Sequence, residues 1–189
     1  MRKIPTLFKR EFDDKHNATI LQEVTPGFEW VLDGEGIATV KYDGACCAII
    51  NGEFYRRYDA KRGKSPPDGA IPCQPEPDPI TGHWPHWVKC NEANSGDKWF
   101  FAALNNVKGN KGFIDGTYEA IGPHFQNNPY KLLEDELVKH GENVVPLPDR
   151  SFYGIRDFLE LHWMEGIVFW KDGFPQCKIK RKDYGIEWP

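Results

Sequence analysis

The sequence predicts an α+β fold in which antiparallel sheets dominate. Short apolar or aromatic runs flank Asn51-Gly52 and Asp172-Gly173, and both dipeptides are strong hairpin turn signals. Helix signals are confined to two segments in the second half of the chain. Because hairpins join antiparallel strands, we expect strand-rich layers accompanied by few helices.

The strands are expected where apolar or aromatic residues run between turn residues. Residues 1–36 are expected to be irregular, with turns at Pro26-Gly27 and Asp33-Gly34. The first predicted strand leads directly into Lys41. The predicted strands cover residues 37–40, 45–50, 53–58, 113–121, 168–170 and 174–179.

Capping residues predict the two helices. Asn128 is a favourable cap, Pro129 suits a first turn and Gly141 suits a terminus, so a helix is expected over residues 129–140. Its apolar face would consist of Leu132, Leu133 and Leu137. Ser151 is expected to cap a second helix, whose apolar side uses Ile155, Phe158 and Leu159.

The composition changes between residues 64 and 99. Seven prolines exclude long regular elements there. We expect an ordered, packed insertion because the segment contains Trp84, Trp87 and Trp99. A zinc site is not expected there, because no structural zinc spacing matches Cys73, His83, His86 and Cys90. With this insertion included, residues 1–189 are expected to form one domain.

The composition describes a soluble globular protein. Hydrophobic residues make up 40% of the chain, and no apolar run approaches the roughly 20 residues that a membrane helix needs. The amino terminus lacks the apolar stretch of a signal peptide. Five cysteines are an odd count, and Cys46 and Cys47 are adjacent in an apolar run. We therefore expect reduced thiols, a cytoplasmic location and no membrane partner.

The charge distribution favours contact with a few phosphates. A net charge of −4 argues against a broad nucleic-acid-coating surface. Basic residues nevertheless cluster within residues 56–64 and 178–182. Local basic stretches in an acidic protein are suited to gripping the phosphates at a nucleic-acid end.

Several segments carry the residue types needed to attack a nucleoside triphosphate and hold the nucleotide covalently. They are Lys41-Tyr42-Asp43-Gly44, Arg56-Arg57, Glu119, Glu165, Lys178 and Lys180. A lysine amine attacks phosphorus only after its pKa falls, and burial or nearby cations lower that pKa. Lys178, Lys180 and Mg²⁺ would provide the cations. Glu119 and Glu165 lie among apolar strand neighbours and need partners there, such as ribose hydroxyls or a metal.

Several residues around the proposed nucleophile have more than one possible role. Strand alternation places Arg57 on the side of Lys41 and Arg56 on the opposite face, while Arg62 is a third candidate. Asp43 would hold the lysine or receive the ribose and the metal shell. Gly44 allows a close backbone approach.

This ordered set resembles the covalent nucleotidyltransferases, the superfamily of polynucleotide ligases and mRNA capping enzymes. The matching strings are KYDG, the arginine at 57, TYEAIGP, EGIVFW and KIK, so the resemblance covers residues from about 37 to the end. The longer strings KYDGACC, GTYEAIGPHFQNNPY and KIKRKDYGIEWP look like the short ATP-dependent 5′-to-3′ RNA ligases of vertebrates and viruses.

The resemblance implies a nucleotidyltransferase fold without a C-terminal oligonucleotide-binding domain. It implies ATP as donor, Mg²⁺ or Mn²⁺ as cofactor, RNA ends as substrate and end-healing enzymes as partners. Lys41 would be adenylated, Glu119 would bind ribose, and Glu165, with Asp43, would bind the metal. The implied ATP-binding residues are Lys41, Asp43, Gly44, Arg57, Glu119, Glu165, Lys178 and Lys180. An adenine-stacking aromatic has two candidates, Phe152 and Tyr153.

Two alternatives remain beside the RNA ligase. A DNA nick ligase or an mRNA guanylyltransferase would use the same lysine chemistry with another substrate or donor. A module that binds RNA ends without catalysis would need no lysine nucleophile. The set of Lys41, Glu119, Glu165, Lys178 and Lys180 argues against that module, because binding alone has no physical need for all five.

Overall fold

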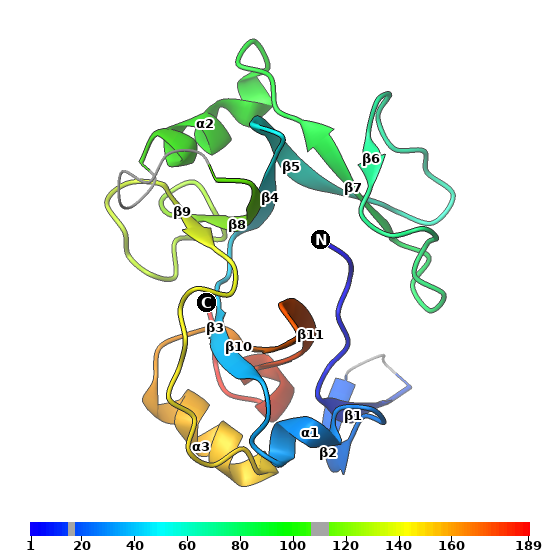
Figure 1. Cartoon of the computed structure of the whole chain (residues 1–189), viewed down its shortest axis with the longest axis vertical. Coiled ribbons are helices and arrows are strands. Elements are labelled where there is room, and N and C mark those ends of the chain that lie inside the picture. Colours follow the sequence, from blue (N-terminus) through cyan, green and yellow to red (C-terminus); the bar gives the residue numbers. More distant parts are fainter. Residues whose placement is uncertain (15–17, 107–113) are drawn as a thin grey trace. The chain divides into compact units, whose positions relative to one another are not determined.

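The structure is a computed structural model that describes residues 1–14, 18–106 and 114–189. It is a mixed α/β structure with mostly antiparallel sheets and few helices, as the α+β prediction requires (Figure 1). The chain divides into two compact units: unit 1 comprises residues 1–3 and 43–140, and unit 2 comprises residues 4–42 and 141–189. The single domain expected over the whole chain stays a prediction. Within the described ranges, no helix has the length and apolar character required to span a membrane.

Unit 1 is built on a six-stranded sheet with the order β6-β7-β5-β4-β8-β9, and all its neighbouring strands are antiparallel. The strands are β4 (Ala45–Ile50), β5 (Glu53–Ala60), β6 (Ile71–Pro72), β7 (Trp84–Lys89), β8 (Gly116–Ile121) and β9 (Glu136–Lys139). The predicted strands at 45–50 and 53–58 are confirmed. The strand expected over 113–121 is confirmed from Gly116 onward, while Phe113 lies outside the described residues.

The turn between β4 and β5 has the conformation that its sequence predicts. Asn51 and Gly52 both have positive φ, 52° and 75°, as a two-residue type I′ hairpin requires. The carboxylate of Asp115 accepts hydrogen bonds from the N–H groups of Asn51 (2.7 Å) and Gly52 (3.0 Å). The hairpin is therefore tied to the residue that precedes β8.

The core of unit 1 lies on one face of this sheet. Helix α2 (Lys98–Asn105), which the sequence analysis did not predict, follows the short 3₁₀-helix η1 (Ser95–Asp97) and supplies Ala103 to the core. The ring of Phe54 meets those of Phe100 and Phe101 edge-on, with centroids 6.4 and 5.9 Å apart. Alternate strand residues complete the cluster: Cys47, Ile49, Tyr118, Ala120 and Leu137. Since strand side chains alternate, the intervening residues belong to the opposite face.

The helix predicted over residues 129–140 is wrong, because a loop and strand β9 occupy that range. Asn128 and Lys131 have positive φ, 52° and 54°, which interrupts a right-handed helix. The Asn128 amide bonds both the N–H (2.9 Å) and the carbonyl (2.8 Å) of Leu132, so the expected cap stabilises a turn instead. Leu133, on the expected apolar face, is 95% exposed, whereas Leu137 is 3% exposed.

The proline-rich insertion between residues 64 and 99 is ordered, as expected, and its regular elements are short: β6, β7 and a 3₁₀-helix. Strand β7 pairs with β5 on one side and with β6 on the other, although it contains Pro85. The Pro85 carbonyl accepts from the Cys73 N–H (2.9 Å) just beyond β6. The donor that proline lacks would point to that same side, so the ladder with β5 is not interrupted. Trp87 is buried as the insertion prediction expected.

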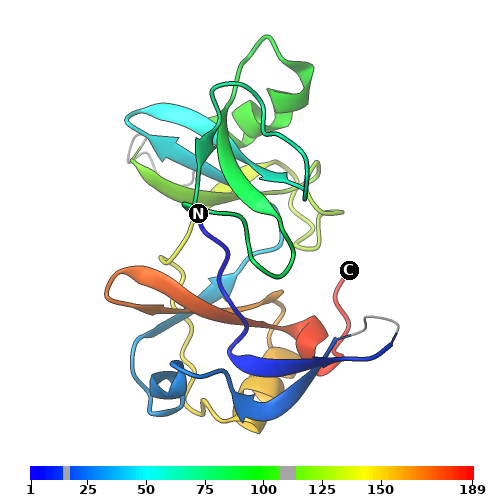
Figure 2. The same ribbon diagram turned by 90° about the vertical axis from the view of Figure 1, so that its right-hand side faces the viewer.

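Unit 2 contains a three-stranded antiparallel sheet with the order β11-β10-β3 and a two-stranded β1–β2 sheet (orange to cyan, and blue, in Figure 2). The strands are β1 (Phe8–Phe12), β2 (Ala18–Val24), β3 (Ile37–Lys41), β10 (Gly166–Lys171) and β11 (Phe174–Lys180). The strands predicted at 37–40, 168–170 and 174–179 are confirmed. Asp172 and Gly173 form the turn of the β10–β11 hairpin with φ of 54° and 78°.

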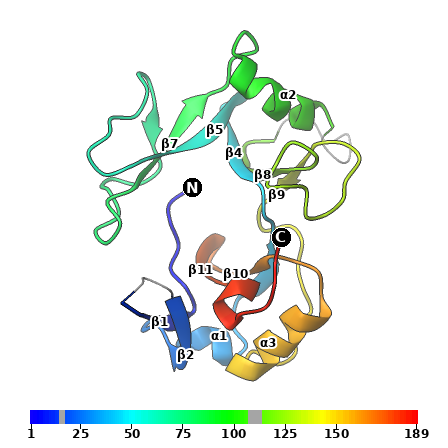
Figure 3. The same ribbon diagram turned by 180° about the vertical axis from the view of Figure 1, so that it is seen from behind.

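Helix α3 (Phe152–Leu161) covers the core of unit 2, beside the C-terminal 3₁₀-helix η2 (Arg181–Tyr184; Figure 3). The Ser151 hydroxyl accepts from the Gly154 N–H (3.1 Å), so the predicted cap is confirmed. Ile155 and Leu159 are fully buried, as the predicted apolar side requires. They pack with sheet residues Ile167, Phe169, Cys177 and Ile179.

The expectation that residues 1–36 are irregular is wrong. They form β1, β2 and the short helix α1 (Glu29–Leu32). Only Phe8 of β1 and Ile20 of β2 are buried in the core, so the apolar alternation that normally identifies a strand is almost absent. The predicted turns are present, since Gly27 and Gly34 have φ of 92° and 85°.

The β9 assignment can be tested with two leucines that share a face in the helix prediction but not in the structure. Leu137→Ala should lower the free energy of unfolding by about 2–5 kcal/mol, because it removes a buried side chain. Leu133→Ala should change it by less than about 0.5 kcal/mol. Urea unfolding measures both values, and equal losses would restore the helix assignment.

Candidate active site

The proposed nucleophile lies on the face of the unit 2 sheet that is turned away from the core. Gly166 of β10 pairs with Lys41 of β3 on one side and with Lys180 of β11 on the other. Val168 likewise pairs with Thr39 and Lys178. Residues directly opposite one another in a sheet share a face. Three lysines from two edge strands therefore gather on one surface, while the alternate residues form the core.

Glu165 joins two of these lysines. It is 3% exposed, and its carboxylate accepts from Lys41 Nζ at one oxygen and from Lys180 Nζ (3.0 Å) at the other. Lys41 Nζ also approaches the Tyr42 carbonyl at 3.4 Å. A buried carboxylate is costly unless it is paired, and here both oxygens face an ammonium group. The pairing fixes the position of the Lys41 amine.

The close approach of β11 explains why a glycine, Gly166, follows Glu165. A Cβ atom there would lie 2.1 Å from the Ile179 carbonyl oxygen and 2.9 Å from the Lys180 Cα atom. No side chain can be accommodated without moving β11. The glycine thus permits the close strand pairing and leaves the position between Lys41 and Lys180 without a side chain.

Lys178 lies in an environment that disfavours an ammonium group. Burial lowers its pKa to about 8, and the charges of Lys41 and Lys180 contribute in the same direction. The chain passes close to it, since the Leu7 N–H donates to the Lys178 carbonyl (2.8 Å) and the Lys178 N–H donates to the Pro5 carbonyl (3.0 Å). An anionic group placed beside this lysine would offset the repulsion.

The unit 1 sheet also separates its core from a polar face. Cys46 of β4 pairs with Glu119 of β8, and the β4–β5 register continues to Arg57 on the other side of Cys46. Arg57 Nε donates to Asp59 (2.8 Å). Arg56 belongs to the core face and bonds to the buried Asp97 (2.7 Å). The two arginines therefore face opposite ways, as strand alternation predicts.

Arg62, the third arginine candidate, lies outside that set. Its guanidinium donates to the Ile80 carbonyl (3.3 Å). Of the three arginines, Arg57 is the one that shares a sheet face with Glu119.

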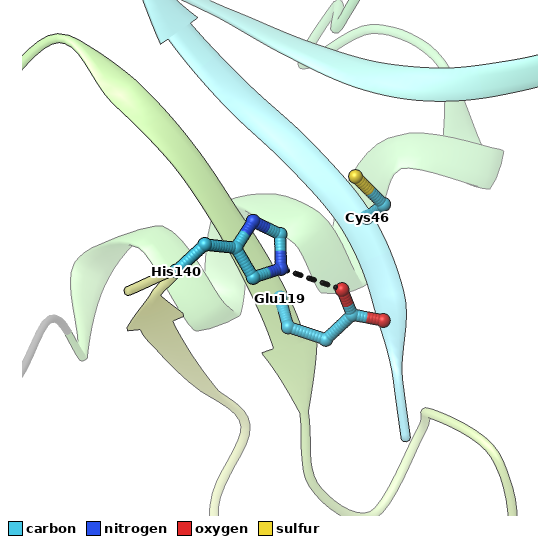
Figure 4. Close-up of side chains that lie close together, drawn as sticks. All are labelled: Cys46, Glu119 and His140. Atoms are coloured by element: carbon cyan, nitrogen blue, oxygen red, sulfur yellow. Dashed lines mark hydrogen bonds and ion pairs between the residues drawn. The ribbon is translucent and has the colours of Figure 1, made fainter. Parts of the chain in front are cut away.

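His140 is a neighbour of Glu119 that the sequence analysis missed. Its Nε2 lies 2.9 Å from a Glu119 carboxylate oxygen (Figure 4). Its Nδ1 lies 3.0 Å from the Thr117 hydroxyl. The residue follows β9, the strand mistaken for a helix. Assigning that segment as a strand beside β8 would have placed His140 opposite Thr117 and diagonal to Glu119.

In the Lys41-Tyr42-Asp43-Gly44 segment the chain passes from unit 2 to unit 1: Lys41 ends β3 in unit 2, and Asp43 is the first residue of the 43–140 segment of unit 1. The Asp43 N–H donates to the Tyr130 hydroxyl (2.6 Å). A Cβ atom on Gly44 would lie 2.2 Å from the Ala120 carbonyl oxygen. The close approach expected of Gly44 is therefore made to the backbone of β8.

The two adenine-stacking candidates have different environments. Phe152 packs edge-on against Phe8 and Tyr184, with centroids 5.0 and 5.1 Å apart, and belongs to the core of unit 2. Tyr153 is half exposed and lies beneath the Arg156 guanidinium (5.2 Å). Of the pair, Tyr153 offers the more accessible ring.

The cysteines and histidines of the insertion occupy separate environments. Cys90 is buried in the core of unit 1, and the buried His86 ring bonds the Trp84 carbonyl (2.9 Å). Cys73 is half-buried, and burial raises its pKa. His83 is also half-buried. That these four residues do not bind zinc stays a prediction.

The structure thus brings Lys41, Glu165, Lys178 and Lys180 together within unit 2, and Arg57 and Glu119 onto one face within unit 1.

No protein-family model matches the chain, and no curated protein matches it either.

The lowered pKa of Lys178 has a measurable cost in stability. At pH 7 the folded state holds a charged lysine that it disfavours, so Lys178→Met should raise the free energy of unfolding by about 1–3 kcal/mol. As the pH rises through about 8, the folded protein loses this proton while the unfolded chain keeps it up to its ordinary pKa of 10.5. The unfolded state then binds more protons, wild-type stability rises, and the advantage of the variant should shrink.

Urea unfolding at pH 7 and at pH 9.5 measures this difference. Lys182→Met is the matched control, because Lys182 is exposed on η2 and its replacement should change little at either pH. An advantage of Lys178→Met that stayed constant with pH would show that the gain is apolar packing rather than relieved charge.

Proposed function

We propose that this protein is an ATP-dependent RNA ligase with a nucleotidyltransferase fold, which seals 5′-phosphate and 3′-hydroxyl RNA ends. The carrying observation is the cluster of three lysines around the buried Glu165 on the polar face of the unit 2 sheet. Lys41 and Lys180 pair with Glu165, and Lys178 lies on the same face, so the cluster carries more positive than negative charge. A triphosphate site needs such an excess of positive charge.

In the first step, the Lys41 amine attacks the α-phosphorus of ATP. A nitrogen–phosphorus bond forms, the bond to pyrophosphate breaks, and the amine gives up its proton. Glu165 holds the amine in position, and its carboxylate, which bonds to Lys41 Nζ, can accept that proton. Lys178 and Lys180 stabilise the negative charge that develops on the phosphate oxygens.

Two further transfers complete the sealing. The 5′-phosphate of one RNA end displaces Lys41 from the AMP phosphorus and forms a 5′-5′ anhydride. The 3′-hydroxyl of the other end then attacks the RNA phosphate and releases AMP. Both steps develop negative charge on phosphate oxygens, so Lys178 and Lys180 can stabilise that charge in all three reactions.

The roles assigned to unit 1 rest on the family resemblance. Glu119 binds the ribose hydroxyls, and Arg57 contacts phosphate. His140 orients the Glu119 carboxylate through its 2.9 Å hydrogen bond. Asp43 assists the metal shell, and Gly44 sets the path of the chain after the nucleophile.

A divalent cation is consistent with Glu165. Carboxylate oxygens are the ligands that Mg²⁺ and Mn²⁺ prefer, and both oxygens of this buried group already face positive charge. Glu165 would hold the ion, which would supply positive charge to the phosphates. One of the two lysines, Lys41 or Lys180, would then contact phosphate in place of Glu165.

The covalent step is tested by incubating the protein with α-labelled ATP and separating it on a denaturing gel. Wild type should become labelled, and Lys41→Ala should not. The variant should still seal RNA that is already adenylated at its 5′ end, because that step bypasses the lysine. Lys171→Ala is the matched control on the same sheet, since Lys171 pairs with Glu35 near the surface and its loss should leave labelling intact.

A labelled Lys41→Ala protein would overturn the nucleophile assignment. Labelling by GTP in place of ATP would support a guanylyltransferase. Unlabelled wild type that still binds RNA ends would support a non-catalytic binding module.

RNA specificity should depend on the 3′-hydroxyl side of the break. Phosphate contacts do not distinguish RNA from DNA, so discrimination must come from 2′-hydroxyl contacts or A-form geometry. Misplacement of the attacking terminus is costly in rate. Replacing the last two nucleotides on that side by deoxynucleotides should slow sealing at least about tenfold. The same change on the 5′-phosphate side serves as the control and should have a much smaller effect, whereas equal sealing of all-DNA and all-RNA nicks would favour a DNA ligase.

A further inference from the structure

Three metal-ligating side chains meet on the polar face of the unit 1 sheet. Cys46 belongs to β4, Glu119 to β8, and His140 follows β9, so three adjacent strands each supply one group. Their sulfur, oxygen and nitrogen atoms all lie within 4.8 Å of one another (Figure 4). Among the described residues, this is the group of three potential ligands that comes this close.

The spacing is near that of a tetrahedral metal site. Ligand atoms at ordinary zinc bond lengths lie roughly 3.3–3.7 Å from one another around the ion. Glu119 and His140 are 2.9 Å apart and would separate slightly, while the Cys46 sulfur would move inward. These are adjustments of side-chain rotamers on a fixed sheet.

The donor set selects the kind of metal. A thiolate and an imidazole are typical ligands of Zn²⁺, whereas Mg²⁺ prefers oxygen ligands alone. A thiolate, a carboxylate and a neutral imidazole together balance the charge of a divalent ion. The site therefore differs in chemistry from the all-carboxylate Glu165 position.

The surroundings of His140 resemble those of a metal ligand. Its second ring nitrogen lies 3.0 Å from the Thr117 hydroxyl, which orients the ring so that Nε2 faces Glu119. Metal-bound histidines commonly make such an outer hydrogen bond. All three residues keep partial exposure, with 12% of the Glu119 side chain and 14% of the His140 side chain accessible, so the group is not sealed from solvent.

We propose that Cys46, Glu119 and His140 bind a thiophilic divalent cation of the Zn²⁺ class, with a fourth position left for water or another small ligand. Binding replaces the proton of the Cys46 thiol by a metal–sulfur bond, so one proton is released for each ion bound. Burial and the charge of Glu119 raise the pKa of Cys46 to about 12, so the metal-free thiol is protonated at neutral pH.

The site has a consequence that rests on the proposed function. Glu119 cannot hold a ribose and a metal ion with the same oxygens. Filling the site therefore withdraws Glu119 from ATP, and zinc-class ions inhibit formation of the lysyl-AMP. Mg²⁺ would not produce this inhibition, because it does not compete for a thiolate site.

Cobalt(II) tests the binding without any assay of ligase activity. Titrating the purified, metal-free protein with Co²⁺ should produce a sulfur-to-cobalt charge-transfer absorption and the visible bands of a tetrahedral ion, at one ion per chain. Zn²⁺ should displace the Co²⁺ and abolish both. Cys46→Ser should eliminate the charge-transfer band, and His140→Gln should weaken binding at least about tenfold.

Cys73→Ser is the control for a neighbouring thiol, since Cys73 lies near enough to Cys46 to affect its pKa but is outside the three-ligand group. It should retain the spectrum. Loss of the band in Cys73→Ser, its retention in Cys46→Ser, or its absence from folded wild type would each overturn the proposal. Circular dichroism of each variant establishes that the comparison is made on folded protein.

The inhibition is tested separately with α-labelled ATP at saturating Mg²⁺. Each variant is normalised to its own labelling without zinc. Zn²⁺ should suppress labelling of wild type at concentrations at least about tenfold lower than for Cys46→Ser. Cobalt binding in a protein that is never labelled would leave the metal site intact and overturn the ligase proposal instead. Equal zinc sensitivity of both proteins would overturn the inhibition.

Discussion

The bonding of Glu165 to two lysines is the interaction on which the candidate site depends. A buried carboxylate without partners would be several kcal/mol unfavourable, so its two oxygens require the ammonium groups of Lys41 and Lys180. Lys180 in turn depends on Gly166, whose missing side chain lets β10 and β11 pair closely. Without the Glu165 carboxylate, or with a side chain at position 166, the lysine ammonium groups would repel one another with nothing to hold them in place.

In both sheets, strand alternation places buried apolar side chains on one face and polar side chains on the other. In unit 2, Ile167 and Ile179 are buried in the core, and their immediate neighbours Gly166 and Lys180 belong to the opposite face. In unit 1, Cys47 packs under α2 while the adjacent Cys46 lies beside Glu119. A polar side chain can therefore occupy every second position without entering the core, which is how a small domain combines stability with concentrated charge.

The sequence predicted those parts of the fold that local chemistry determines. Asn51-Gly52 and Asp172-Gly173 demand positive φ, and Ser151 caps the helix that follows it, so these features were found without tertiary information. The strand β9 was missed because Asn128 and Pro129 suit a helix start, and only pairing with β8 makes the segment a strand. His140 was lost with it.

For the candidate site, too, the sequence indicated which residues to consider but not which contacts they make. Motif order selected Lys41, Glu165, Lys178 and Lys180 as candidates, and the structure brings them together, but the motifs did not predict the lysine partners of Glu165. Burial and lysine repulsion lower the pKa of Lys178 to about 8, so the charged form of this lysine is disfavoured in the cluster. A bound phosphate would neutralise part of that repulsion and raise the pKa again. By linkage, the same charges that reduce the stability of the free protein favour binding of an anion, and a polyphosphate satisfies that demand better than a single carboxylate.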